Sequence, residues 1–267
     1  MSPHHGTEVG PLGITFLDRE TLLVGCAIQE GNSNAVSVYR LRERPKSINA
    51  SNSDSKHDLK VTDAKNGTEF FWGLAFGGTS LFVTCEGPDE WIASASISER
   101  TITDLKPLVS PAALFETKAP SPIIRSPEGF LSVGFAGARD GNPDSLLAFF
   151  EEDGKFLGSI RLGLHDVSGL AYGPNQKQLF AIDYSHAQPE NGALYRLTES
   201  RTSEVCEKHE IMKLSRPTAM VFDSLGNLYV AVCGESKPGS EKNPGSVIKI
   251  SGLDVLPVPP KRNTKCP

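Results

Sequence analysis

The amino-acid sequence predicts an all-β protein built from repeated four-stranded sheets. Five copies of one pattern follow one another along the chain, each with short apolar runs separated by turn residues. Gly and Asn in these turns supply the positive φ angles that tight hairpins need. The 3.6-residue apolar spacing of amphipathic helices is hardly visible. Short strands with closely spaced turn signals are typical of an all-β domain.

Each copy opens with a small residue or proline and three apolar-leaning residues, followed by a turn and a Leu-x-Val run or a close variant. Successive copies start 60, 49, 47 and 50 residues apart, at Gly13, Gly73, Pro122, Gly169 and Ala219. These two runs predict the first two strands of each sheet. The expected pairs are 13–16 with 22–24, 73–76 with 81–83, 122–125 with 131–133, 169–172 with 179–181, and 219–222 with 228–230.

Further apolar runs complete the sheets. Third strands are expected at 35–41, 91–97, 145–150, 192–197 and 245–250. Fourth strands are expected in four copies, at 58–61, 101–105, 156–162 and 210–214. The fifth copy shows no clear fourth run, and the candidates to complete its sheet are residues 253–258 or the N-terminal arm.

Four-stranded sheets in this repetition predict a β-propeller, in which the sheets pack radially as blades around a central channel. The first strand of each copy is expected innermost, where Gly13, Gly73 and Gly169 leave room for converging backbones. Two arrangements stay open: a five-bladed propeller, or a six-bladed one whose N-terminal blade is missing. We expect an N-terminal arm over residues 1–10, one propeller domain over 11–258 and a polar C-terminal tail over 259–267.

Composition argues against several function classes. The net charge is −5, so no general basic field collects nucleic acid. No stretch approaches the ~18 apolar residues of a membrane span. The first residues carry no export signal, which predicts a cytoplasmic protein, and we expect it to be a monomer. Five cysteines without a paired spacing predict neither a disulfide framework nor a thiolate metal site.

One face of the propeller is the expected binding surface, because loops at one end of a rigid scaffold usually carry function. Second-strand ends and the loops after them gather there, together with the positions just before the first strands. Six polar or aromatic residues at these places are the candidate ligand-binding residues: Trp72, Glu86, Ser168, Asp183, Thr218 and Glu235. The expected partner is a small molecule, a glycan or a protein.

Two stretches carry a family resemblance: Val167-Ser168-Gly169-Leu170-Ala171-Tyr172 with 179–183, and Arg216-Pro217-Thr218-Ala219 with 226–230. They resemble the NHL-repeat and regucalcin/gluconolactonase propellers, over residues 11 to about 253. Residues 163–172 are similar to a bacterial NHL-type subgroup. The resemblance implies a propeller that is typically six-bladed.

Members of the gluconolactonase group hold a divalent metal, usually Ca²⁺, over the channel with Glu, Asn and Asp. Asp183 stands where the resemblance places the Asp. Ser168 stands at the Asn position, and Val9 stands at the Glu position with Glu8 beside it. The resemblance therefore implies a Ca²⁺ site at Asp183, for which Glu86 is a further candidate ligand.

Two functions from different classes stay open. The preferred interpretation is a non-catalytic binding scaffold, because the sequence has no nucleophile elbow and no separated triad. The alternative is a metal-dependent lactonase in which a cation at Asp183 polarises a lactone carbonyl and activates water, with His165 as the candidate catalytic base. These residues also have a structural interpretation, in which His165 and Asp166 bond the backbone where the chain enters an inner strand and Asp183 caps a strand end and bonds the loop below it.

Overall fold

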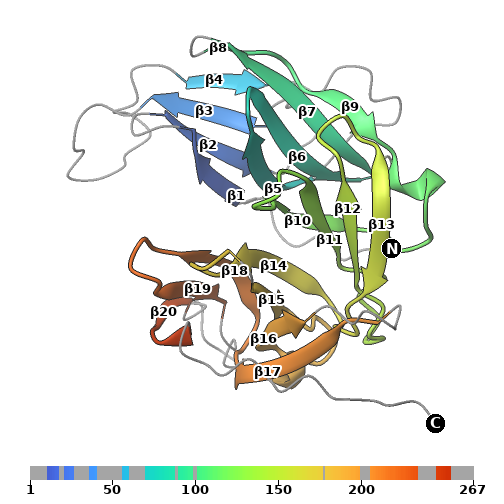
Figure 1. The fold of residues 1–267 in the computed structure, drawn as a ribbon, viewed down its shortest axis with the longest axis vertical. Coiled ribbons are helices and arrows are strands. Elements are labelled where there is room, and N and C mark those ends of the chain that lie inside the picture. Colours follow the sequence, from blue (N-terminus) through green and yellow to red (C-terminus); the bar gives the residue numbers. More distant parts are fainter. Residues whose placement is uncertain are drawn as a thin grey trace, which may run out of the picture.

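The computed structural model describes residues 11–17, 21–26, 36–40, 56–59, 70–87, 90–98, 101–176, 178–198, 205–233 and 245–253. These residues form five antiparallel sheets that follow one another in chain order (Figure 1). Two 3₁₀ turns, η2 (Pro111–Ala113) and η3 (Pro189–Asn191), are the helical elements of two or more residues in the described part. The protein is an all-β propeller, as predicted.

Each of the first two sheets starts with its inner strand. The first sheet has the order β1 (Pro11–Phe16), β2 (Thr21–Cys26), β3 (Val36–Arg40) and β4 (Lys56–Leu59). The second has the order β5 (Phe70–Gly77), β6 (Ser80–Glu86), β7 (Trp91–Ser98) and β8 (Thr101–Ile102), and β9 (Lys106–Val109) pairs with β7 as well.

The remaining three sheets repeat the same order. The third contains β10 (Pro120–Arg125), β11 (Leu131–Phe135), β12 (Leu146–Phe150) and β13 (Phe156–Arg161). The fourth contains β14 (Val167–Tyr172), β15 (Leu179–Asp183), β16 (Ala193–Thr198) and β17 (Glu207–Lys213). The fifth contains β18 (Pro217–Phe222), β19 (Leu228–Val232) and β20 (Ser246–Ile250).

The fourth strands differ most from expectation. Of the strand expected at 101–105, only Thr101–Ile102 (β8) is formed, and β9 follows it at Lys106–Val109; the two pair with different parts of β7. The Thr103 hydroxyl accepts the Ser96 N–H at 2.9 Å, so a side chain takes over part of the ladder at the break. Outer strands have a neighbour on one side only, which leaves their ends weakly specified by the apolar pattern. Residues 1–10 and 254–267, including most of the proposed completing strand, lie outside the described ranges.

The first strand of each copy is innermost, as predicted, because β1, β5, β10, β14 and β18 each pack on the next. A Cβ on Gly13 would overlap the Trp72 carbonyl, and one on Gly73 would lie 2.5 Å from the Ser121 oxygen. Gly169 differs from the prediction, since its Cβ would meet the Ile182 side chain of the same sheet at 2.8 Å. Two of the three glycines therefore permit close backbone approach between blades.

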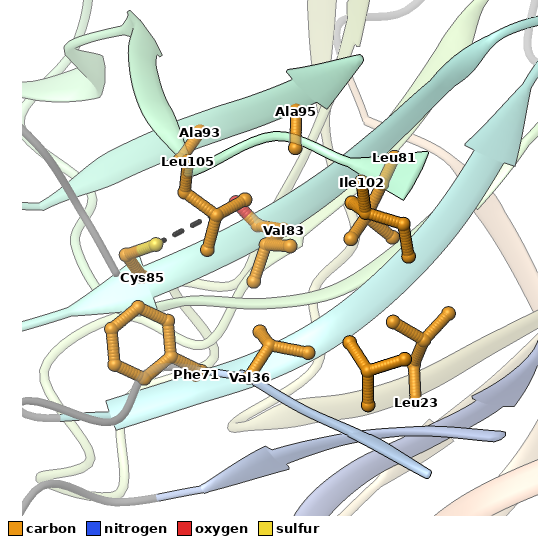
Figure 2. Close-up of a cluster of buried hydrophobic side chains, with 11 residues drawn as sticks. Leu23, Val36, Phe71, Leu81, Val83, Cys85, Ala93, Ala95, Ile102 and Leu105 are labelled. Carbon is orange, nitrogen blue, oxygen red and sulfur yellow. Dashed lines mark hydrogen bonds between the residues drawn. The ribbon is translucent and has the colours of Figure 1, made fainter. Parts of the chain in front are cut away.

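Apolar side chains fill the spaces between successive sheets. Figure 2 shows the cluster between the first two sheets, where Leu23 and Val36 face Phe71, Leu81 and Val83. Corresponding clusters join the second sheet to the third, the third to the fourth and the fourth to the fifth. This repeated packing fixes each sheet against the next and gives the loops at the strand ends a rigid support.

Cys85 lies in the first of these clusters, and its thiol donates a hydrogen bond to the Val83 carbonyl at 3.7 Å (Figure 2). Complete burial raises the pKa of this thiol, because the charged thiolate is poorly solvated there. Cys85 is thus a packing residue with little nucleophilic character at neutral pH.

The first and last sheets each expose apolar residues on the face that points away from their neighbour. Ile14 of β1 is 65% exposed, Val221 of β18 is 61% exposed and Val247 of β20 is 67% exposed. Within the described ranges, no packing like that between the other inner strands joins β18 to β1. Within the part of the chain that the structure describes, the blades pack continuously from the first sheet to the fifth, and each end sheet has one face that no other described sheet covers.

This difference between the two faces of the fifth sheet predicts unequal effects of the same substitution. Val230→Ala removes two methyl groups from a fully buried position and should lower the free energy of unfolding by about 2 kcal/mol. Val247→Ala, on the open face, should change it by less than about 0.5 kcal/mol. Urea unfolding followed by circular dichroism measures both. Equal losses would show that something covers the open face.

No helix among the residues that the structure describes has the length and apolarity to cross a membrane.

Candidate functional site

Every inner strand has a bulge near its start, on the side of the candidate face. The pairing of first and second strands shifts between Pro11 and Gly13, Phe71 and Leu74, Pro120 and Ile123, Val167 and Gly169, and Pro217 and Ala219. Trp72, Ser168 and Thr218, three of the predicted binding residues, occupy these bulges. Bulges redirect side chains and occur often beside functional sites. The sequence predicted these positions but not the bulge that sets their direction.

Trp72 and Glu86 form the centre of one polar cluster. The Trp72 indole Nε1 donates a hydrogen bond of 2.6 Å to Glu86 Oε2. Arg139, from the β11–β12 loop of the next sheet, donates from Nη2 to the same oxygen at 2.8 Å. Its guanidinium carbon lies 5.7 Å from the centre of the Trp72 ring, in cation–π range. Neighbouring blades thus share one carboxylate, one cation and one aromatic ring.

Arg139 has a backbone φ of 58°, in the left-handed region that non-glycine residues seldom adopt. Such strain persists only where the surroundings enforce it, and it is concentrated at functional sites. The repeat pattern placed the loops after the second strands on this face, but Arg139 was not among the predicted binding residues. Nothing in a polar loop sequence reveals that one guanidinium reaches the carboxylate of another blade.

Glu90 borders this cluster from the β6–β7 loop. Its carboxylate accepts the Ala119 N–H at 3.1 Å. Burial raises the pKa of Glu90 and the charge of Glu86 adds to the rise, whereas the Ala119 hydrogen bond and the Arg139 charge oppose it. The charge of Lys118 opposes the rise as well, so two cations act on the carboxylates of this cluster.

Asp183 lies at the end of β15, and its side chain is only 1% exposed. Its Oδ1 accepts the N–H groups of Asp166 at 2.8 Å and Ser185 at 3.1 Å. Its Oδ2 accepts the His165 N–H at 2.9 Å and lies 3.3 Å from His165 Nδ1. The Asp183 carboxylate thus ties the start of β14 to the end of β15, and both oxygens are engaged.

Asp166 precedes β14 and is buried beside this network. Its Oδ2 accepts the His186 N–H at 2.6 Å, so Asp166 bonds the backbone as its structural interpretation expected. Its Oδ1 is buried and has no hydrogen-bond partner in the described part of the chain. Burial raises the pKa of Asp166, with the charge of Asp183 in support and the charge of Arg139 in opposition.

The hydroxyls of Ser168 and Thr218 both donate hydrogen bonds to backbone carbonyl oxygens. Ser168 Oγ donates to the Pro217 carbonyl at 2.7 Å, which joins the fourth sheet to the fifth. Thr218 Oγ1 donates to Ala231 O at 3.3 Å within its own sheet. These bonds support the blades and leave less capacity for ligand. Glu235, the sixth candidate, lies outside the described residues.

The predicted metal ligands do not meet in one oxygen-rich cavity. Glu86 belongs to the cluster with Trp72 and Arg139, whereas Asp183 is surrounded by N–H donors. Ca²⁺ requires six to eight oxygen ligands. Within the described ranges, no three His, Cys, Asp or Glu side chains are grouped so that they could hold a metal ion. The donor set around Asp183, as folded here, does not fit Ca²⁺.

A hollow of about 430 Å³ lies at the opposite ends of the strands, between the β10–β11 and β14–β15 turns. Two of its polar side chains have partners: Arg125 is paired with Glu152 at 2.6 Å and the Tyr172 hydroxyl lies 3.3 Å from Ser132 Oγ. We therefore place the candidate site on the face that carries Trp72, Arg139 and Asp166.

Comparisons with known proteins agree with this architecture. Neither protein-family models nor curated protein sequences give a match. Among solved structures, a luciferin-regenerating enzyme matches with a TM-score of 0.56 and 17% identity, over 83% of this chain and 68% of that one. A gluconolactonase from Xanthomonas campestris matches with a TM-score of 0.54 and 15% identity, over 80% of this chain and 66% of that one.

A third structure is regucalcin, a calcium-binding protein from Agrobacterium tumefaciens, with a TM-score of 0.54 and 13% identity over 85% of this chain and 70% of that one. At these identities the likeness concerns the fold. The protein has the β-propeller fold of the gluconolactonase and regucalcin structures, in agreement with the resemblance found in its sequence.

Proposed function

We propose that this protein is a non-catalytic binding propeller that recognises a small polar ligand at the face where the second strands end. The observation that carries the proposal is the cluster of Trp72, Glu86 and Arg139, which three different loops and strand ends bring together. A rigid aromatic ring beside one acid and one base is a recurrent arrangement for binding polar molecules.

The partial exposure of the cluster supports this role. The Glu86 side chain is 18% exposed and that of Arg139 is 37% exposed, so both are held in place yet reachable from solvent. A ligand can accept hydrogen bonds from the remaining Arg139 N–H groups and donate to the second Glu86 oxygen. Because the cluster joins two neighbouring blades, the propeller fixes the distance between these groups before a ligand arrives.

The metal-dependent lactonase is the weaker alternative. It requires the Asp183 oxygens to face a cation, but three backbone N–H groups occupy them. His165, the candidate base, contacts the same carboxylate through Nδ1. In this arrangement Asp183 supports the loop before β14, and no reaction step is assigned to it.

Two arginines of similar exposure provide a matched test. A thermal-shift screen of monosaccharides, amino acids and amines identifies ligands of the wild type, and isothermal titration calorimetry measures their affinity. We expect Arg139→Gln to weaken binding at least about tenfold, because it removes a charged donor from the site. Arg125→Gln, at the opposite ends of the strands, breaks an ion pair of comparable exposure and should leave affinity unchanged. The reverse pattern would move the site to the opposite hollow.

A further inference from the structure

The site contains a buried acid that the Trp72 cluster does not explain. Asp166 is only 3% exposed, and its Oδ1 has no hydrogen-bond partner among the described residues. Its other oxygen is fixed by the His186 N–H at 2.6 Å, which prevents the carboxylate from turning freely. A buried unpaired carboxylate oxygen is costly, so native proteins rarely keep one without a functional reason or a bound partner.

The backbone holds two aromatic side chains beside this carboxylate. The Tyr184 N–H donates to the Asp166 carbonyl at 2.9 Å, which keeps the β15–β16 loop against the start of β14. The rings of Tyr184 and His186 are stacked, with centroids 6.1 Å apart and an angle of 26° between their planes. Aromatic faces next to a carboxylate are favourable surroundings for an organic cation.

The carboxylates that surround Asp166 also favour a cationic ligand. Asp166 and Asp183 repel each other, and Glu90 and Glu86 do so on the neighbouring blade. Arg139 is the cation that acts on both pairs. Lys118 also acts on Glu90, Lys208 on Asp183 and Arg216 on Tyr184, whereas among the described residues no cation donates a hydrogen bond to Asp166 Oδ1. A cationic ligand relieves this repulsion and an anionic one increases it.

We propose that Asp166 Oδ1, with the Tyr184–His186 aromatic pair, binds the ammonium group of a small primary amine. This position lies on the candidate face, at the fourth sheet. This inference rests on the proposed binding function and names the chemistry of its ligand. Because Oδ1 is shielded from solvent, binding of the amine requires that neighbouring side chains move aside. The ammonium then supplies the hydrogen bond that Oδ1 lacks.

Three probes of nearly equal size separate charge from shape: ethanolamine, ethylene glycol and glycolate. Calorimetry and ligand-observed NMR on the full chain should show binding of ethanolamine in preference to the neutral and the anionic probe. Asp166→Asn keeps the shape of the side chain but removes its charge, and it should lower the affinity for ethanolamine about ten- to a hundredfold. Asp153→Asn, in the exposed β12–β13 turn, is the matched control and should have no effect.

A pH series on the wild type tests the same inference without a variant. Ethanolamine stays protonated throughout the acidic range, so its affinity should fall as Asp166 becomes protonated. The charged and titratable groups that face Asp166 are Asp183, Arg139, His186 and Tyr184. The His186 N–H donates to Asp166, and the fall should therefore persist in His186→Gln, which keeps this backbone donor, and disappear in Asp166→Asn.

Three results would overturn the inference. If glycolate or ethylene glycol bound as tightly as ethanolamine, the preference for an ammonium group would be refuted. The proposed function would still hold if Arg139→Gln weakened the binding of glycolate or ethylene glycol. Ethanolamine binding that is unchanged in Asp166→Asn, or undetectable in the wild type, would remove Asp166 from the site.

Discussion

Gly73→Ala should lower the free energy of unfolding by about 3 kcal/mol, because the new methyl group has no space. Its Cβ would lie 2.5 Å from the Ser121 carbonyl oxygen and 2.7 Å from the Ile123 backbone nitrogen of the next blade. Backbone atoms on both sides cannot move away as a flexible side chain could. The same carbonyl accepts the Thr84 hydroxyl at 2.6 Å, so the substitution also disturbs a hydrogen bond between blades.

Gly245→Ala is the matched control for this experiment. Its Cβ would be 3.6 Å from the nearest atom, the Val232 carbonyl oxygen, which is an ordinary contact. Urea unfolding of both variants should show a large loss for Gly73→Ala and little change for Gly245→Ala. If Gly73→Ala were as stable as the control, the inner strands would not converge as closely as the propeller requires.

Asp183→Ala should cost on the order of 3–5 kcal/mol, because the substitution leaves three backbone N–H groups without their acceptor. Those groups belong to His165, Asp166 and Ser185, and the carboxylate that serves them is almost completely buried. The loss should appear in thermal and urea unfolding, and its size should be the same with EDTA as with Ca²⁺.

Asp153→Ala is a suitable comparison, since its carboxylate serves one N–H, that of Lys155, in an exposed turn. We expect it to cost at most about 1 kcal/mol. A contrary result would be a wild type stabilised by Ca²⁺ and an Asp183→Ala variant that is stable in EDTA but no longer responds to the metal. That outcome would restore Asp183 as a metal ligand and with it the lactonase alternative.

The inner strands were predictable because their signal is local. Residues 122–125 and 169–172 are apolar runs next to turn residues, and β10 and β14 include them with two more residues at the start. Those added residues are Pro120, Ser121, Val167 and Ser168, which lie at or next to the bulges. A bulge is set by the approach of the neighbouring strand, so the apolar pattern of one strand does not reveal it.

The candidate site was predictable in part for the same reason. The repeat placed Trp72 and Glu86 on one face, and the structure joins them directly. It did not reveal Arg139, whose contact with Glu86 depends on a left-handed backbone conformation at a residue with no sequence signal for it. Asp166 was interpreted as a backbone partner, but the sequence could not show that only one of its two oxygens has a partner among the described residues.

The sequence by itself determined the all-β class, the order of the strands and the level at which each polar residue stands, because side-chain alternation and turn chemistry act between neighbours in the chain. Only the tertiary structure decided which of those residues meet. Glu86 and Arg139 are 53 positions apart, and their 2.8 Å contact depends on how two blades pack. Hydrogen bonds tolerate errors of a few tenths of an ångström, and only the complete three-dimensional arrangement sets distances to that precision.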